Sequence, residues 1–197
     1  MTVIAGLIYA GGESSRFGAD KATALLQGRR LIDHVAERLE PQVTTFAVAG
    51  PVELTGAPCL DDGIHSNKGP LAGLLAGLNW AKDLADTTWL VTAPCDVPLL
   101  PTNLVALLTE NLTDTPRILN IEERWQTGCA LWPTSAAPLL ENTLIENEDL
   151  SLHRALRSLN VEVIETSPET LDGSFLNINT QDDLIEFAKE VPGSRVS

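Results

Sequence analysis

The chain has 197 residues, of which 44% are hydrophobic and 20% are charged, and its formal net charge is −14. This length and composition suit a single globular domain with a sizeable core. The negative charge makes a long nucleic acid an unfavourable partner, whereas a small anion could still bind where a few cations gather. The apolar start, residues 1–9, has no basic n-region and is too short to span a membrane, so we interpret it as a buried strand.

The cysteine pattern points to a reducing compartment. Cys59, Cys95 and Cys129 are odd in number and widely spaced, with no CxxC motif. That pattern favours reduced thiols over a disulfide framework or a zinc site, and so favours the cytoplasm, with no membrane association. The acidic neighbour Asp96 disfavours a thiolate at Cys95, which we interpret as a core residue and not as a nucleophile.

Apolar runs and amphipathic spacings alternate along the chain. They predict strands at residues 3–9, 44–49, 89–93, 117–121, 129–132, 161–165 and 175–178. They predict helices at residues 31–39, from 70 onward, around 104–108, and at 138–145, 152–159 and 181–190. This alternation predicts a three-layer α/β/α sandwich with a mostly parallel, Rossmann-like sheet. We expect one domain, residues 1–190, and a flexible tail, residues 191–197.

The loop after the first expected strand, residues 11–21, combines glycines with two cations. Glycines let backbone N–H groups approach phosphate oxygens, and Arg16 and Lys21 supply positive charge. The loop is not a Walker A motif, because Ala22 follows the lysine where a Ser or Thr is needed, and it lacks GxGxxG spacing. We interpret it as a phosphate-binding loop, with a plain connecting turn as the alternative.

Two acidic features also follow expected strands, at the sheet edge where ligands bind in this class of fold. Asp96 ends an apolar strand, where a carboxylate is costly unless it is hydrogen-bonded or bound to a cation. Mg²⁺ needs only one or two carboxylates besides substrate phosphates. The alternatives are that Asp96 bonds loop backbone or caps a helix, and that Asp61 and Asp62 form an Asx turn before Gly63.

An asparagine pair lies near the end of the chain. Asn177 and Asn179 alternate on an expected strand, so both amides should face the same side and could contact a polar ligand. The alternative is that they cap the helix beginning near Gln181, for which Thr180 is itself a good N-cap.

These segments, in this order, resemble the molybdenum cofactor guanylyltransferase family, within the nucleotide-diphospho-sugar transferase-like superfamily. The matching segments span nearly the whole chain: YAGG at residues 9–12, RFGADK at 16–21, GPLAG at 69–73, PCDVP at 94–98 and FLNINT at 175–180. One departure is Gly50, at the end of the second expected strand, where the family commonly offers an asparagine to the nucleotide.

The resemblance implies an enzyme that transfers GMP from GTP to a molybdopterin-type cofactor and releases pyrophosphate. It implies catalytic roles for Arg16, Lys21 and Asp96, with Asp96 also binding Mg²⁺, and places Asn177 and Asn179 near the pterin substrate. The implied nucleotide-binding residues are Tyr9, Ala10, Gly11, Gly12, Lys21, Asp62 and Asp96. Molybdoenzyme-maturation proteins are the partners expected beyond the two substrates.

Other functions remain open from sequence. One alternative is a molybdopterin cytidylyltransferase or a sugar-phosphate nucleotidyltransferase of the same superfamily, although Gly12 favours the guanylyl branch. Another is a nucleotide-binding regulator without catalysis, against which the intact Lys21 and Asp96 argue.

Overall fold

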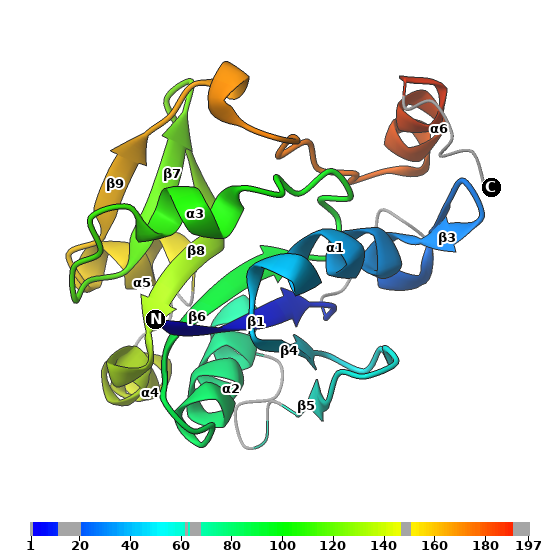
Figure 1. Ribbon diagram of the computed structural model, residues 1–197. Coiled ribbons are helices and arrows are strands. Elements are labelled where there is room, and N and C mark those ends of the chain that lie inside the picture. Colours follow the sequence, from blue (N-terminus) through cyan, green and yellow to red (C-terminus); the bar gives the residue numbers. More distant parts are fainter. Residues whose placement is uncertain (1, 12–20, 62, 64–67, 147–150, 191–197) are drawn as a thin grey trace.

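The computed structural model describes residues 2–11, 21–61, 63, 68–146 and 151–190. Within them a seven-stranded sheet has the order β5-β4-β1-β6-β8-β7-β9, and a two-stranded ribbon stands apart from it (Figure 1). The sheet strands are β1 (Val3–Tyr9), β4 (Thr45–Ala49), β5 (Cys59–Leu60), β6 (Thr87–Pro94), β7 (Arg117–Ile121), β8 (Arg124–Pro133) and β9 (Glu162–Glu165). The ribbon is formed by β2 (Leu25–Leu26) and β3 (Arg29–Arg30).

Most neighbouring strands run parallel. Strands β5, β4, β1 and β6 are parallel to one another, and β7 is parallel to β9. Among the seven strands of the described sheet, only β8 runs against its neighbours, pairing antiparallel with both β6 and β7. The carboxyl ends of β1, β4 and β6 therefore meet at one edge of the sheet, where ligands bind in such folds.

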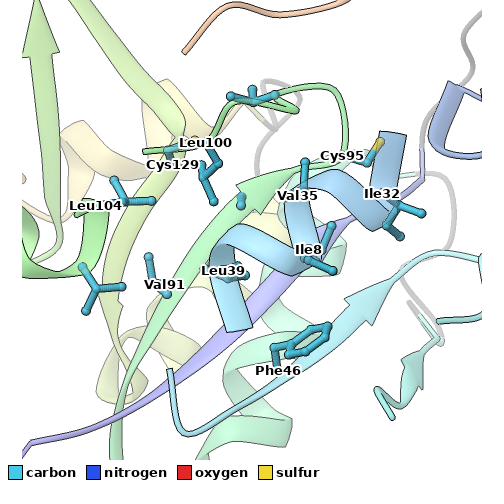
Figure 2. Close-up of a cluster of buried hydrophobic side chains, with 14 of the residues drawn as sticks. Ile8, Ile32, Val35, Leu39, Phe46, Val91, Cys95, Leu100, Leu104 and Cys129 are labelled. Carbon is cyan, nitrogen blue, oxygen red and sulfur yellow. The ribbon is translucent and has the colours of Figure 1, made fainter. Parts of the chain in front are cut away.

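Helices cover both faces of the sheet. On one face, α1 (Leu31–Leu39) and α3 (Leu104–Thr109) pack against the strands. Figure 2 shows part of this core, with Ile32, Val35 and Leu39 of α1 close to Ile8 of β1. The opposite face is covered by α2 (Pro70–Lys82), α4 (Ala137–Glu146) and α5 (Leu152–Ser158). The predicted three-layer α/β/α sandwich is confirmed. None of the described helices is long and apolar enough to cross a membrane.

Short 3-10 turns complete the described chain: η1 (Lys21–Thr23), η2 (Glu40–Gln42), η4 (Thr134–Ala136) and η5 (Pro168–Thr170). The last helix, α6 (Gln181–Glu190), stands apart from the sheet beside the β2–β3 ribbon (Figure 1). A small third core joins these parts through Leu26, Leu31, Ile178 and Phe187. This packing holds the segment before α6 close to the start of α1.

The strand predicted at residues 175–178 is wrong, because this segment bonds to a loop and not to the edge of the sheet. Ser174 N donates to the carbonyl of Leu99 at 2.7 Å, and Ile178 N donates to the carbonyl of Asp96 at 2.9 Å. Gly173 has φ +144°, and a Cβ there would lie 2.5 Å from the Leu99 carbonyl oxygen. The segment thus follows the loop after β6, which places residues 177–179 beside Asp96.

Strand β8 begins five residues earlier than the predicted strand at 129–132. Its first half is polar and partly exposed, so hydrophobic patterning did not mark it. The pairing with β7 is irregular there, since Ile118 faces Ala130 while Asn120 faces Trp125.

Arg117, the first residue of β7, is a buried cation that sequence patterning did not reveal. It is only 2% exposed. Its guanidinium donates to the carbonyls of Leu108 at 2.8 Å and Glu110 at 2.6 Å, and to Glu162 Oε1 at 3.0 Å. A hydrogen bond from Thr113 and the Arg117 charge lower the pKa of Glu162. One side chain thereby ties α3 and β9 to β7.

Candidate functional site

Three polar side chains from distant parts of the chain meet at the carboxyl edge of the sheet. Lys21 Nζ lies 2.5 Å from Asp96 Oδ2 and 3.0 Å from Asn179 Oδ1. The side chains of Lys21 and Asp96 are 18% and 16% exposed, so the ion pair is partly shielded from water. The structure therefore brings together two predicted catalytic residues and one predicted acceptor contact.

The backbone around Asp96 is held on two sides. Cys95 N donates to the Tyr9 carbonyl at 3.0 Å, which extends the pairing of β6 with β1. The Asp96 carbonyl accepts from Ile178 N at 2.9 Å, so the loop after β6 is bonded to the segment before α6. These contacts leave the Asp96 carboxylate directed at Lys21.

One oxygen of that carboxylate has no partner within the part of the chain that the structure describes. Asp96 Oδ1 is buried and makes no hydrogen bond to any of the described residues. A buried, unpaired carboxylate oxygen is costly, and a bound cation would remove that cost. Within the described residues, no three His, Cys, Asp or Glu side chains gather as a metal site. A cation here would take few protein ligands, as Mg²⁺ does when phosphates supply the others.

The residues behind Asp96 are apolar or neutral. Cys95 and Cys129 lie in the core that contains α1 (Figure 2). Burial raises the pKa of Cys129, and the Asp96 charge raises it further, so the thiol stays protonated. Burial also raises the pKa of Tyr9, whose side chain packs in the core on the α2 face. A ligand at this edge would therefore meet the backbone of residue 9 and not its phenol.

The start of the glycine-rich loop lies against the end of β4. Ala10 N donates to the Ala49 carbonyl at 2.8 Å. Gly50 has φ +126°, and a Cβ at this position would lie 2.7 Å from Gly11 N and 2.8 Å from the Ala10 carbonyl carbon. Only glycine fits such a backbone and such a contact. This close approach explains why no asparagine stands at position 50 in this chain.

Some predicted site residues lie outside the described residues: Gly12, Arg16 and Asp62. Beside Asp62, the Asp61 carboxylate accepts from Gly63 N at 2.6 Å, which is the Asx turn considered as an alternative. Gly11 and Asn177 are exposed at this edge, and Ala10 is buried. The structure thus places Tyr9, Ala10, Gly11, Lys21, Asp96, Asn177 and Asn179 on a single edge of the molecule.

A capping box before α6 positions Asn179. Thr180 Oγ1 accepts from Asp183 N at 3.0 Å, so Thr180 is the N-cap. The Asp183 carboxylate accepts from Asn179 N at 2.8 Å and Thr180 N at 2.9 Å, and these bonds lower its pKa. Because the cap uses only the backbone of Asn179, its side chain is available to contact Lys21. Asp183 was missed in the sequence, although Thr-x-x-Asp at 180–183 is a recognisable capping pattern.

Comparison with known proteins identifies the family. Residues 6–163 match the model of the MobA-like NTP transferase domain. The chain belongs to this family. The resemblance inferred from the motifs is confirmed, and so is the expectation that the protein is an enzyme of nucleotidyltransferase type.

Relatives of the MobA-like family match most of the chain. A protein of Rhizobium leguminosarum bv. trifolii (strain WSM2304), named molybdenum cofactor guanylyltransferase, is 36% identical over 190 residues, 93% of this chain and 90% of the relative. One of Yersinia pestis (strain Pestoides F) with the same name is 37% identical over 187 residues, 91% of this chain and 92% of the relative.

A solved structure shares the fold. Molybdopterin-guanine dinucleotide biosynthesis protein A from Archaeoglobus fulgidus superposes with a TM-score of 0.72 at 25% identity, covering 94% of this chain and 97% of the other.

Proposed function

We propose that this protein transfers GMP from GTP to a molybdopterin-type cofactor and releases pyrophosphate. The observation that carries the proposal is the contact of Lys21 with Asp96 and Asn179 at the edge where the glycine-rich loop begins. The name of the MobA-like relatives, molybdenum cofactor guanylyltransferase, supports guanylyl transfer and a molybdenum cofactor as acceptor. The cofactor phosphate is the acceptor in this reaction.

The chemistry needs alignment and charge more than it needs a base. An oxygen of the acceptor phosphate attacks the α-phosphorus of GTP, a new P–O bond forms, and the bond to pyrophosphate breaks. The attacking oxygen is already anionic, so no proton has to be removed from it. No covalent enzyme intermediate is required, and the protein acts by positioning and by stabilising negative charge.

Lys21 supplies a positive charge that can move from protein oxygens to the substrate. Its ammonium group lies on Asp96 and Asn179, at the mouth of the phosphate-binding loop. When the triphosphate binds, the ammonium group can transfer to phosphate oxygens, which are stronger acceptors than an amide. Lys21 would then hold the α-phosphoryl group in line with the acceptor.

Asp96 is the residue that would hold Mg²⁺, the metal we propose for a family that generally uses a divalent ion. The fit rests on Asp96 Oδ1, the buried oxygen without a partner among the described residues. Bound there, Mg²⁺ would neutralise charge on the phosphates. Asp96 thus acts as a metal ligand and not as a general base.

The test is pyrophosphate release from purified protein with Mg²⁺ and molybdopterin, in the presence of GTP, CTP, ATP or UTP in turn. We expect release only with GTP and only when molybdopterin is present. Asp96→Asn keeps the shape of the side chain but removes its charge, and should lower the rate about 100-fold or more.

The matched control is Asp86→Asn, an exposed aspartate in the turn before β6, at the opposite edge of the sheet. It should leave the rate unchanged. Release with CTP in place of GTP would assign the protein to the cytidylyl alternative. Full turnover by Asp96→Asn would remove the metal role of Asp96.

A further inference from the structure

Trp125 is turned toward α5 by an irregularity in β8. Between the pairs Ile118–Ala130 and Asn120–Trp125, β7 advances two residues while β8 advances five. In a regular strand Trp125 would share a face with Cys129 and lie in the α1 core. It packs instead with the core on the α2 and α5 face. Bulges of this kind often redirect a side chain next to a functional site.

The redirected indole meets two planar groups of α5. The rings of Trp125 and His153 have centroids 4.9 Å apart, tilted by 37°. Arg157 Cζ lies 5.2 Å from the Trp125 ring centroid. His153 and Arg157 are four residues apart and share one face of the helix. Both are exposed and Trp125 is half-buried, so a ligand in solution can reach this cluster.

Arg157 gives the cluster a positive charge, although the protein as a whole is acidic. Arg124 lies beside Trp125 on β8, and Arg154 and Arg157 lie on α5. These arginines are three of the 13 Lys and Arg residues of the chain, whose formal net charge is −14. A guanidinium lying over an indole favours a ligand that is both planar and anionic.

This cluster lies on the same strand that passes the proposed active site. Thr92 Oγ1 donates to the Gly128 carbonyl at 2.9 Å, and a Cβ at Gly128 would lie 3.2 Å from Pro94. Gly128 therefore lies beside Pro94, the last residue of β6, and Pro94 precedes Asp96 by two residues. Trp125 comes three residues before Gly128 on β8, so their Cα atoms are at most about 10 Å apart by strand geometry.

We propose that Trp125, His153 and Arg157 form the platform on which the heteroaromatic ring of the acceptor stacks, while its phosphate reaches Asp96 and Lys21. The proposal rests on the function proposed above and adds residues that bind the far end of the acceptor. Indole and guanidinium faces stack on flat heterocyclic rings without needing a particular hydrogen-bond pattern.

The pocket beside α6 is a poorer site for the same ring. A cavity of about 250 Å³ lies between α6 and the segment before it, lined by Leu176, Asn177, Ile178, Asp183, Glu186 and Phe187. Its two charged groups are carboxylates, which would repel an acceptor that carries negative charge. Arg157 beside Trp125 would attract it.

The test separates acceptor binding from nucleotide binding in the full-length protein. Trp125→Ala should raise the KM for molybdopterin about tenfold or more, the size expected for losing one ring stack. The Kd for GTP with Mg²⁺, measured by calorimetry, should not change. Trp125→Phe retains an aromatic face and should restore the molybdopterin KM to within about threefold of wild type.

A charge-matched pair of variants completes the test. Arg157→Ala should raise the molybdopterin KM several-fold, while Arg154→Ala, which removes the same charge from the same helix, should raise it less. If Trp125→Ala does not fold, the comparison of Arg157→Ala with Arg154→Ala still tests the platform. A lower Tm with an unchanged molybdopterin KM would show that the cluster only fastens the β7–β8 hairpin to α5, and would overturn the platform.

Failure of the platform can be told apart from failure of the proposed function. If the wild-type protein transfers GMP and the variants keep the wild-type KM for the acceptor, the platform alone is overturned. A wild-type protein that transfers no nucleotide to molybdopterin overturns both.

Discussion

Lys21 connects the two substrate sides of the candidate site at the scale of single residues. Its ammonium group binds the carboxylate that would hold the metal and the amide expected near the acceptor. Hydrogen bonds to charged groups contribute about 1.5–3 kcal/mol each, so a ligand has to offer more than these two oxygens to displace them. Phosphate oxygens do so, whereas a neutral ligand would not.

Gly50 is a residue where a single added methyl group should disturb both the fold and the candidate site. Gly50→Ala would place a Cβ against the backbone of residues 10 and 11 at a φ of +126°. We expect a loss of about 1–3 kcal/mol of stability from backbone strain, with a Tm lower by about 2–4 °C for each kcal/mol. Because residues 10 and 11 begin the phosphate-binding loop, GTP affinity should fall as well.

Gly28→Ala is the control for Gly50→Ala. Gly28 also has a positive φ, of +81°, but a Cβ there would meet nothing within 4 Å. Gly28→Ala should therefore cost less stability and leave GTP affinity unchanged. Equal Tm values for the two variants would show that the contact with residues 10 and 11 is unimportant.

At the scale of elements, the N-terminus of α6 links the acceptor side to the rest of the site. Its capping box fixes the backbone of Asn179 through the Asp183 carboxylate. The segment before it is bonded to the loop after β6, so the two loops form one unit. A change in either loop should alter the position of the Lys21 ammonium group, because Lys21 contacts both loops.

The Asp183 cap should make stability depend on pH. Amide hydrogen bonds lower the pKa of Asp183 in the folded protein, relative to about 3.9 for an unfolded aspartate. The carboxylate thus stabilises the fold above about pH 4, and this stabilisation is lost as the pH falls through the lowered folded pKa. Asp183→Asn should lower the Tm at pH 7, and the difference from wild type should shrink toward zero at pH 2.

Asp182→Asn is the control, because Asp182 is an exposed neighbour in the same first turn of α6. It should change the Tm at pH 7 less than Asp183→Asn does. A difference between Asp183→Asn and wild type that persists unchanged from pH 7 to pH 2 would contradict the capping role.

At the scale of the whole molecule, one sheet edge collects the ends of three central strands and the loops that follow them. A ligand there contacts residues from the beginning, middle and end of the chain, so binding should stabilise the whole fold. GTP with Mg²⁺ at about 100 times its Kd should add about 2.7 kcal/mol. A thermal-shift measurement should then show a Tm increase of roughly 5–11 °C.

Asp96→Asn tests whether this stabilisation uses the metal. In that variant, removal of Mg²⁺ should no longer change the shift produced by GTP. CTP, ATP and UTP should give smaller shifts than GTP with the wild-type protein. Equal shifts from all four nucleotides, or none from GTP, would contradict the guanine specificity proposed here.

Local order along the chain was predictable because it depends on neighbours in sequence. The apolar run ending at Tyr9, the amphipathic spacing of α1 and the Gly-Pro start of α2 each determine an element through short-range propensity and burial. Their alternation was enough to predict the layered fold. The same reasoning failed for residues 175–178, where an apolar and amide pattern resembles a strand but pairs with a loop.

Sequence alone also indicated which residues carry charge at the site, because a lysine after glycines and an aspartate after a buried strand are unusual there. Only the tertiary structure decided which of them meet. Lys21 is 75 residues from Asp96 and 158 from Asn179, so their contacts depend on strand order and loop packing. The glycine at position 50, the burial of Arg117 and the turn of Trp125 toward α5 were likewise decided by close approach between distant segments, which no local pattern encodes.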